Sequence, residues 1–234
     1  PGVKDHTWYL DYRYKGLWPV IDLRYEFRKP WFDASGYDDI EPFRWSEHYV
    51  SARASVPLDF SRYRTFRYLS PSLQVSHMNR LPDPTTDDRF ITGDLSWLQA
   101  RLFAYNLSQQ AHRDIWPRFG QVLEMNYLNT IGGTLNAGNA WSGALVTYWP
   151  GLLKDHGIRI YAAVQEKHSK EFGFSQLIST ARGHAYGQLF NGFSIRSNYQ
   201  LPLLNPDVAL GPLAYIKRIR TKLFYDYTEG EGEE

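Results

Sequence analysis

Apolar and polar residues alternate along much of this chain. In segment 20–28 every second residue is apolar and the residues between them are charged, so that Ile21, Leu23, Tyr25 and Phe27 alternate with Asp22, Arg24, Glu26 and Arg28. Segments 8–14, 158–165 and 193–201 show the same period of two. Successive side chains of a β-strand point to opposite faces, whereas a helix would scatter these apolar residues around its axis. We therefore predict an all-β chain.

The alternating segments predict about ten antiparallel strands. They are expected near residues 6–14, 18–28, 45–58, 63–78, 93–107, 118–129, 139–149, 156–167, 188–201 and 212–227. Short turns that contain Pro or Gly are expected together at one rim, the periplasmic one, at 15–19, 149–156 and 203–206. Longer polar loops are expected at the opposite rim, at 29–44, 79–90, 129–138 and 168–187. This arrangement is typical of an outer-membrane barrel.

A soluble β-sandwich or lipocalin-like barrel would also show alternation. Two features favour a membrane barrel. The expected strands are about twice the usual five or six residues of soluble strands. Their polar sides also carry Asp, Glu, Arg, Asn and Gln at mid-strand, as a water-filled lumen requires. We therefore expect residues 1–234 to belong to an antiparallel transmembrane β-barrel of the Gram-negative outer membrane. Its lipid-facing residues should be Ile21, Leu23, Phe27, Ile158, Ile160 and Val164.

Composition agrees with this interpretation and narrows the possible chemistry. Aromatic residues make up 16% of the chain, which suits a lipid face with interfacial girdles. The balance of 26 Lys and Arg against 25 Asp and Glu argues against nucleic acid as the main partner. The absence of cysteine excludes disulfides, thiol catalysis and thiolate metal sites. Because no histidine has a metal-ligand spacing, no metal or other cofactor is expected.

Enzymatic chemistry has little support in the sequence. Asp87 and Asp88 in one loop, with His168 or His184 in another, could form an acid–base group at the loop rim. Loop carboxylates are usually only solvated, so we expect no enzyme. The glycine-rich segment 132–138 lacks the Lys-Ser/Thr ending of a phosphate loop and is interpreted as a flexible connection.

Three parts near the C-terminus occur in an informative order. Segment 181–186 reads Ala-Arg-Gly-His-Ala-Tyr, the strand at 198–202 ends in Pro, and the last strand carries Phe224-Tyr225-Asp226. Over about residues 149–228 this order resembles the Arg-Gly-aromatic motif region of the BamA/TamA superfamily, the outer-membrane insertases and translocases. The resemblance implies that Arg182 tips a loop back into the lumen and pairs with Asp226. It also implies that Gly183 permits a tight turn and that Tyr186 is the aromatic of the motif.

The sequence departs from this family pattern at three places. Asn198 stands where the family usually has Glu, which would weaken the hold on Arg182, although Asn198 could still accept one hydrogen bond from it. Tyr186 lies two residues later than the usual aromatic, and Thr228 replaces the glycine that follows the Asp-bearing motif. In the family, the motif loop follows the eleventh of sixteen strands. The resemblance therefore implies that this chain holds about ten strands of a sixteen-stranded barrel.

The resemblance implies a non-enzymatic role in outer-membrane protein assembly or translocation. Lipid, unfolded outer-membrane proteins and accessory assembly proteins would be the partners. A passive pore or surface scaffold is the alternative, and Asn198 favours it. An open sheet cannot stay in lipid with unpaired edges. Either further strands lie outside this chain, or about ten strands close on themselves.

Overall fold

The structure is a computed structural model that describes residues 3–16, 18–32, 43–83, 91–110, 114, 116–153, 155–168, 173–183, 189–204, 206–211, 214–216 and 219–232. Ten long strands account for most of them: β1 (Val3–Tyr14), β2 (Val20–Phe32), β3 (Phe43–Ser55), β5 (Thr65–Pro82), β6 (Gly93–Ser108), β7 (Gly120–Gly133), β8 (Asn139–Pro150), β9 (Gly157–His168), β10 (Leu189–Leu204) and β13 (Ile219–Gly232). The short strands are β4 (Leu58–Asp59), β11 (Val208–Leu210) and β12 (Ala214–Ile216). No helix in the described ranges is long and apolar enough to cross a membrane. The all-β prediction is confirmed.

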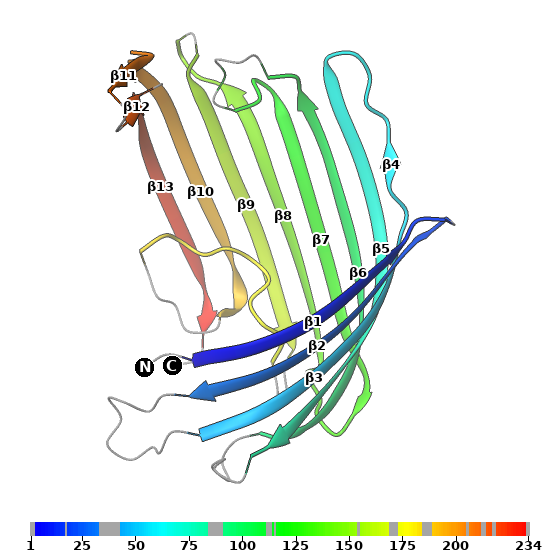
Figure 1. Ribbon diagram of the computed structural model, residues 1–234. Helices are drawn as coiled ribbons and strands as arrows, with labels where there is room; N and C mark the ends of the chain where they lie inside the picture. The colour runs from blue at the N-terminus through cyan, green and yellow to red at the C-terminus, as the bar shows by residue number, and fades with distance from the viewer. Residues whose placement is uncertain are drawn as a thin grey trace, which may run out of the picture.

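The long strands form one antiparallel sheet in which each strand pairs with its neighbour in sequence. The order is β1-β2-β3-β5-β6-β7-β8-β9-β10-β13, with β4 added beside β5. The sheet curves strongly, so that β1–β3 sweep across the front of the view while β6–β9 stand behind them (Figure 1). It remains open, because among the described residues β1 pairs only with β2 and β13 pairs only with β10. Closure of about ten strands on themselves, one of the two alternatives from the sequence, is therefore wrong.

The connections depart from the expected division into short turns and long loops. The turns expected at 15–19, 149–156 and 203–206 do share one rim, because each follows a strand of the same direction in the meander. However, the connection from β10 to β13 spans 205–218 and contains the β11–β12 hairpin, so the single strand expected at 212–227 is divided. The β10–β13 register shifts between Pro202 and Leu204. Proline has no N–H to donate to the ladder, which accounts for an irregularity at this point.

The connection expected as a long loop at 129–138 is, in contrast, shorter than predicted. β7 continues to Gly133 and β8 begins at Asn139, so only 134–138 connect them. Thr134 is fixed to the start of β6, because its backbone N–H and its hydroxyl both donate to the Asp94 carboxylate, over 3.2 and 2.9 Å. These side-chain bonds, which alternation does not reveal, hold the strand ends together.

The two faces of the sheet differ in polarity. We call the face crossed by segment 173–183 the inner face, and it lies on the inside of the curve (Figure 1). The opposite, outer face carries exposed apolar side chains on nine of the ten long strands, as shown by Leu10, Leu23, Val50, Leu73, Met125, Leu145, Ile160, Ile195 and Leu223, which are each at least 36% exposed. Charged residues on the outer face lie near strand ends, at Lys29, Arg44, Arg67, Asp94, Glu166 and Glu229. Soluble proteins rarely expose so large a continuous apolar surface.

The inner face is held together by charge pairs and hydrogen bonds. On β2, Glu26 is buried and pairs with Arg24 and Arg28. Arg80 pairs with Glu47 at 2.7 Å, and Arg101 with Glu124 at 2.9 Å. Further links are Arg13 with Asp22 and Arg53 with Gln74. The buried polar residues of the molecule therefore lie where a soluble sandwich would place its dry core.

One prediction follows from the close approach of β10 and β13. Gly192 and Gly230 are paired directly. A Cβ added at Gly192 would lie 2.8 Å from the Gly230 Cα and closer still to the Glu229 carbonyl oxygen, so the backbone would have to move. We expect Gly192→Ala to lower the free energy of unfolding by about 1–3 kcal/mol, measured by urea denaturation in detergent. Gly143→Ala is the control, since its Cβ would meet only Val164 at 4.0 Å; equal losses for the two variants would contradict the argument.

Candidate functional site

Segment 173–183 lies across the inner face and is fixed there at both ends. Near its start, Phe174 packs in a buried cluster with Leu95, Leu128, Leu135, Ala137 and Ala140. Further along, Ile178 packs against Ala163 and Leu189. These apolar contacts account for the small buried hydrophobic core of the molecule. They explain why a connecting segment lies against the sheet rather than projecting from the rim.

Backbone groups of this segment are bonded by side chains that point up from the strands. The Oε1 atom of Gln165 accepts hydrogen bonds from the N–H groups of Leu177 and Ile178, at 3.0 and 3.2 Å. Its Nε2 donates to the Leu189 carbonyl at 2.5 Å. Gln165 is only 1% exposed and joins β9, β10 and the segment. Its side chain therefore bonds three backbone groups, two from the segment and one from β10.

The segment ends in a bidentate ion pair. The Arg182 Nε donates to Asp226 Oδ2 at 2.5 Å, and its Nη2 donates to Oδ1 at 2.6 Å. The Arg182 backbone N–H also donates to Asp226, at 3.1 Å, while the preceding N–H of Ala181 donates to the Thr228 hydroxyl. The expected contact between Arg182 and Asp226 is present. β13 therefore holds the tip of the segment through two successive inner-face residues.

The surroundings of Arg182 stabilise its charge. The hydrogen bond to Asp226 raises the pKa of the Arg182 guanidinium, although partial burial opposes the shift. The guanidinium also lies over the Phe224 ring, with its carbon 4.2 Å from the ring centre, a cation–π geometry. Gly183 has φ +82°, a conformation that glycine adopts without strain. Gly183 therefore has a backbone conformation of the kind that the expected tight turn needs.

Asn198 does not bind Arg182 as expected. It lies on β10 opposite Phe224 and is 2% exposed, and its Oδ1 has no hydrogen-bond partner among the described residues. The reason is geometric, because the Arg182 fork is directed at the β13 carboxylate and its plane covers Phe224. Arg196, which the sequence argument did not include, is the second cation near Asp226, with 3.7 Å between its Nε and Oδ2. Tyr186, the motif aromatic, lies outside the described residues.

The sequence predicts which way the side chains of Gln165 and Arg196 face, but not what they contact. Alternation places both on the polar faces of their strands, but many polar residues share that property. Their roles depend on which strands are neighbours and on where segment 173–183 lies. The register makes these contacts explicit, because Arg196 stands directly opposite Asp226 on β13.

Removal of the Gln165 side chain should release the segment. In Gln165→Ala, two N–H groups and one carbonyl lose their partner, and each buried unsatisfied group costs about 1–3 kcal/mol if it cannot reach water. We expect faster amide hydrogen exchange at residues 174–183, with the strands unchanged, measured by mass spectrometry. The matched control is Gln99→Ala, which removes one inner-face bond to Asn126. Unchanged exchange at 174–183 in Gln165→Ala would contradict the proposed contact.

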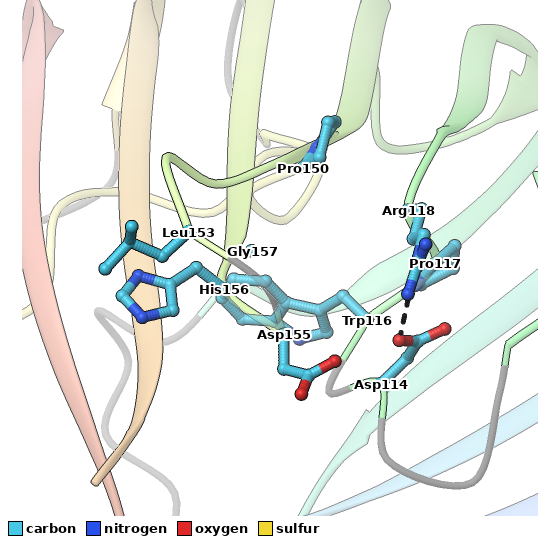
Figure 2. Close-up of a pocket in the computed structure, with 9 residues that line it drawn as sticks. All are labelled: Asp114, Trp116, Pro117, Arg118, Pro150, Leu153, Asp155, His156 and Gly157. Atoms are coloured by element: carbon cyan, nitrogen blue, oxygen red, sulfur yellow. Dashed lines mark ion pairs between the residues drawn. The ribbon is translucent and has the colours of Figure 1, made fainter.

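A small pocket at the rim of turn 151–156 is the other candidate site. It measures about 110 Å³ and is lined by Asp114, Trp116, Pro117, Arg118, Pro150, Leu153, Asp155, His156 and Gly157. Figure 2 shows Trp116 between His156 and Arg118. Arg118 forms an ion pair with Asp114 at 3.5 Å. The pocket is smaller than the roughly 300–1,000 Å³ of typical ligand sites. None of its nine lining residues offers a hydroxyl or thiol nucleophile.

The residues of the acid–base group considered for the loop rim, which would make the protein a hydrolase, are not brought together by the described part of the chain. His168 pairs with Glu166 at 3.2 Å on the outer face of β9, away from the inner face. Asp87, Asp88 and His184 lie outside the described residues. In the ranges that the structure covers, no group of three or more His, Asp or Glu side chains could hold a metal ion.

The candidate site with the most specific geometry is therefore the Arg182–Asp226 pair. Phe224 and Arg196 lie beside it, and the hydrogen bonds of Gln165 hold the same segment. This site can hold a segment against the inside of the curved sheet. Comparisons of this chain with protein-family models, with characterised proteins and with solved structures find no match.

Proposed function

We propose that this chain forms part of an outer-membrane β-barrel of the BamA/TamA type, which takes part in the assembly or translocation of outer-membrane proteins. The observation that carries the proposal is the segment laid across the inner face and fixed by Arg182 to Asp226. The family resemblance implies this pairing for its motif loop. Unfolded outer-membrane proteins, accessory assembly proteins and lipid are the partners that follow from the proposal.

The polarity of the sheet supports placement in a membrane. Strands of 12 to 18 residues are long enough, because about 9–11 residues cross the hydrocarbon core when tilted. The apolar outer face would meet lipid, and the polar inner face would line a wet lumen. Two histidines on the outer face have hydrogen-bond partners, His48 with Tyr25 and His77 with Ser96. Pairing of this kind lowers the cost of polar groups in lipid.

The open edges bear on how the barrel is completed. β1 and β13 expose unpaired backbone groups, which lipid cannot satisfy. We propose that further strands pair with these edges, to a total of sixteen as in the family. We also place the rim of turns 15–19 and 151–156 on the periplasmic side. In this arrangement segment 173–183 enters the lumen from the opposite, extracellular rim.

A folding assay separates this function from the alternative. Liposomes that contain the full-length protein should accelerate folding of an urea-unfolded small β-barrel client, followed by its resistance to SDS at room temperature. Arg182→Ala should reduce the acceleration, because the segment is no longer held. A passive pore would leave client folding at the rate of empty liposomes while conducting ions across planar bilayers, and that result would reject the assembly role. The observation that favours the pore is that Asn198 stands where the family usually has Glu, so that Arg182 has only one carboxylate partner among the described residues.

A further inference from the structure

Positive charge gathers on the inner face of β9, β10 and β13 without matching carboxylates. Arg159, Arg196 and Lys222 point to this face, and segment 173–183 adds Arg182. Among the described residues of these three strands, Asp226 is the only inner-face carboxylate, and it already contacts Arg182 and Arg196. Asp226 can therefore offset only one of these four positive charges. On β1 to β7, by contrast, five inner-face arginines pair with Asp22, Glu26, Glu47 or Glu124, and a sixth, Arg53, bonds Gln74.

The four cations surround Asn198. In the register, Asn198 stands between Arg159 of β9 and Phe224 of β13. Arg196 is the preceding inner-face residue of β10, and Arg182 covers Phe224. Lys222, the preceding inner-face residue of β13, is within electrostatic range of all three arginines. We call Arg159, Arg182, Arg196 and Lys222 the cationic patch. Like charges at such close quarters repel, so the patch is stabilised by an added anion.

Hydrogen-bonding groups in the patch are also left over. The Arg196 Nε atom is buried and has no hydrogen-bond partner among the described residues, and neither has the side-chain oxygen of Asn198. A half turn of the Asn198 amide exchanges its oxygen with its NH₂ group, which is a donor. Arg159 and Lys222 form no ion pair with any described residue. An oxyanion beside Asn198 would therefore meet charged and neutral donors that nothing described here satisfies.

We propose that the cationic patch around Asn198 binds a phosphate group. The guanidinium groups of Arg159 and Arg196 and the ammonium of Lys222 suit phosphate, since arginine binds its oxygens in pairs and lysine acts as a point charge. Arg182, whose fork is occupied by Asp226, adds positive charge beside them. A phosphate monoester carries about −1.5 to −2 charge and has three acceptor oxygens, which matches the uncompensated charge better than a single carboxylate does. The proposal concerns an inner-face site and does not depend on the assembly role.

The test is calorimetric titration of the full-length protein in zwitterionic detergent with inorganic pyrophosphate. Binding is expected in the wild type. Asn198→Glu places a carboxylate among the four cations and should weaken binding at least about tenfold, which corresponds to about 1.4 kcal/mol. This variant relieves repulsion, so its thermal unfolding temperature should rise, and lost binding cannot then be caused by misfolding. Gln99→Glu adds the same charge to the inner face of β6 and should leave the affinity within about twofold.

Two further arms identify the source of the phosphate. Phosphatidylglycerol added to the micelles should compete with pyrophosphate if lipid headgroups reach the patch, and should not compete if only soluble phosphates do. Both results support a phosphate site. The proposal is overturned if the wild type shows no binding, or if Asn198→Glu and Gln99→Glu weaken it equally, because the effect would then be one of net charge. It is also overturned if a glutamate-rich peptide of equal charge binds more tightly than pyrophosphate and loses its binding in Asn198→Glu.

Discussion

Ile160→Arg is expected to lower the free energy of unfolding of the membrane-inserted protein by about 2–4 kcal/mol. Ile160 lies on the outer face of β9, between Ile158 and Ala162, and is 36% exposed in the chain alone. If that face meets lipid, an arginine near the midplane loses its hydration without gaining a partner. The measurement is reversible urea unfolding in lipid vesicles, followed by tryptophan fluorescence.

The depth of the substitution provides the control. Leu81→Arg changes an outer-face residue one position from the end of β5, which is 42% exposed. Near the interface the same change should cost only about 0–1 kcal/mol, because the guanidinium can reach water and headgroups. Equal small losses at both positions would mean that the outer face meets water. If Ile160→Arg and the unaltered protein were both folded in detergent-free buffer and unfolded at the same urea concentration, the fold would be soluble.

Arg182→Ala is expected to cost about 2–4 kcal/mol, because it leaves the Asp226 carboxylate, only 5% exposed, without its bidentate partner. Arg196 lies 3.7 Å from that carboxylate and should recover part of the loss, so the effect should fall short of a fully unpaired charge. Arg182→Lys should restore only part of the stability, since an ammonium cannot form the fork or cover Phe224 as a plane. Urea denaturation of the refolded wild type and of both variants measures these differences.

A second inner-face pair serves as the comparison. Arg101 and Glu124 lie 2.9 Å apart but are each more than a third exposed. Exposed pairs contribute about 0–1 kcal/mol, so Arg101→Ala should have a small effect. If Arg101→Ala and Arg182→Ala cost the same, the Arg182 pair is an ordinary surface contact. The proposed anchoring of segment 173–183 would then lose its energetic basis.

The strands were predictable from the sequence because their signal is local. A period of two in segments such as 20–28 depends only on which residues face which side. Nine of the ten expected strands are present within four residues of their predicted ends, whereas the tenth, expected at 212–227, is divided into β12 and β13. The ends themselves depend on contacts across the sheet. Thr134 bonded to Asp94 shortens one connection, and the irregularity at Pro202 precedes the β11–β12 hairpin. Neither feature can be detected from hydrophobic periodicity.

The candidate site was predictable only where a motif pointed to it. The order of Arg182, Gly183 and Asp226 led to the ion pair, whereas the expected bond from Arg182 to Asn198 was wrong. Whether a guanidinium turns toward β10 or β13 depends on its side-chain rotamer and on the Phe224 ring beneath it. The role of Gln165 depends on three backbone groups far from it in sequence. Such contacts require the packed fold.

The central claim, that the outer face of this sheet lies in a lipid bilayer, can be measured residue by residue. The chain has no cysteine, so single cysteines at successive positions 158–165 of β9 can each carry one spin label. In reconstituted vesicles, paramagnetic relaxation by oxygen, which concentrates in lipid, should be strong at 158, 160, 162 and 164 and weak at the residues between them. A water-soluble nickel complex should show no such maximum at the even positions. Even positions that are reached by nickel, or shielded from both reagents, would contradict a lipid-facing surface.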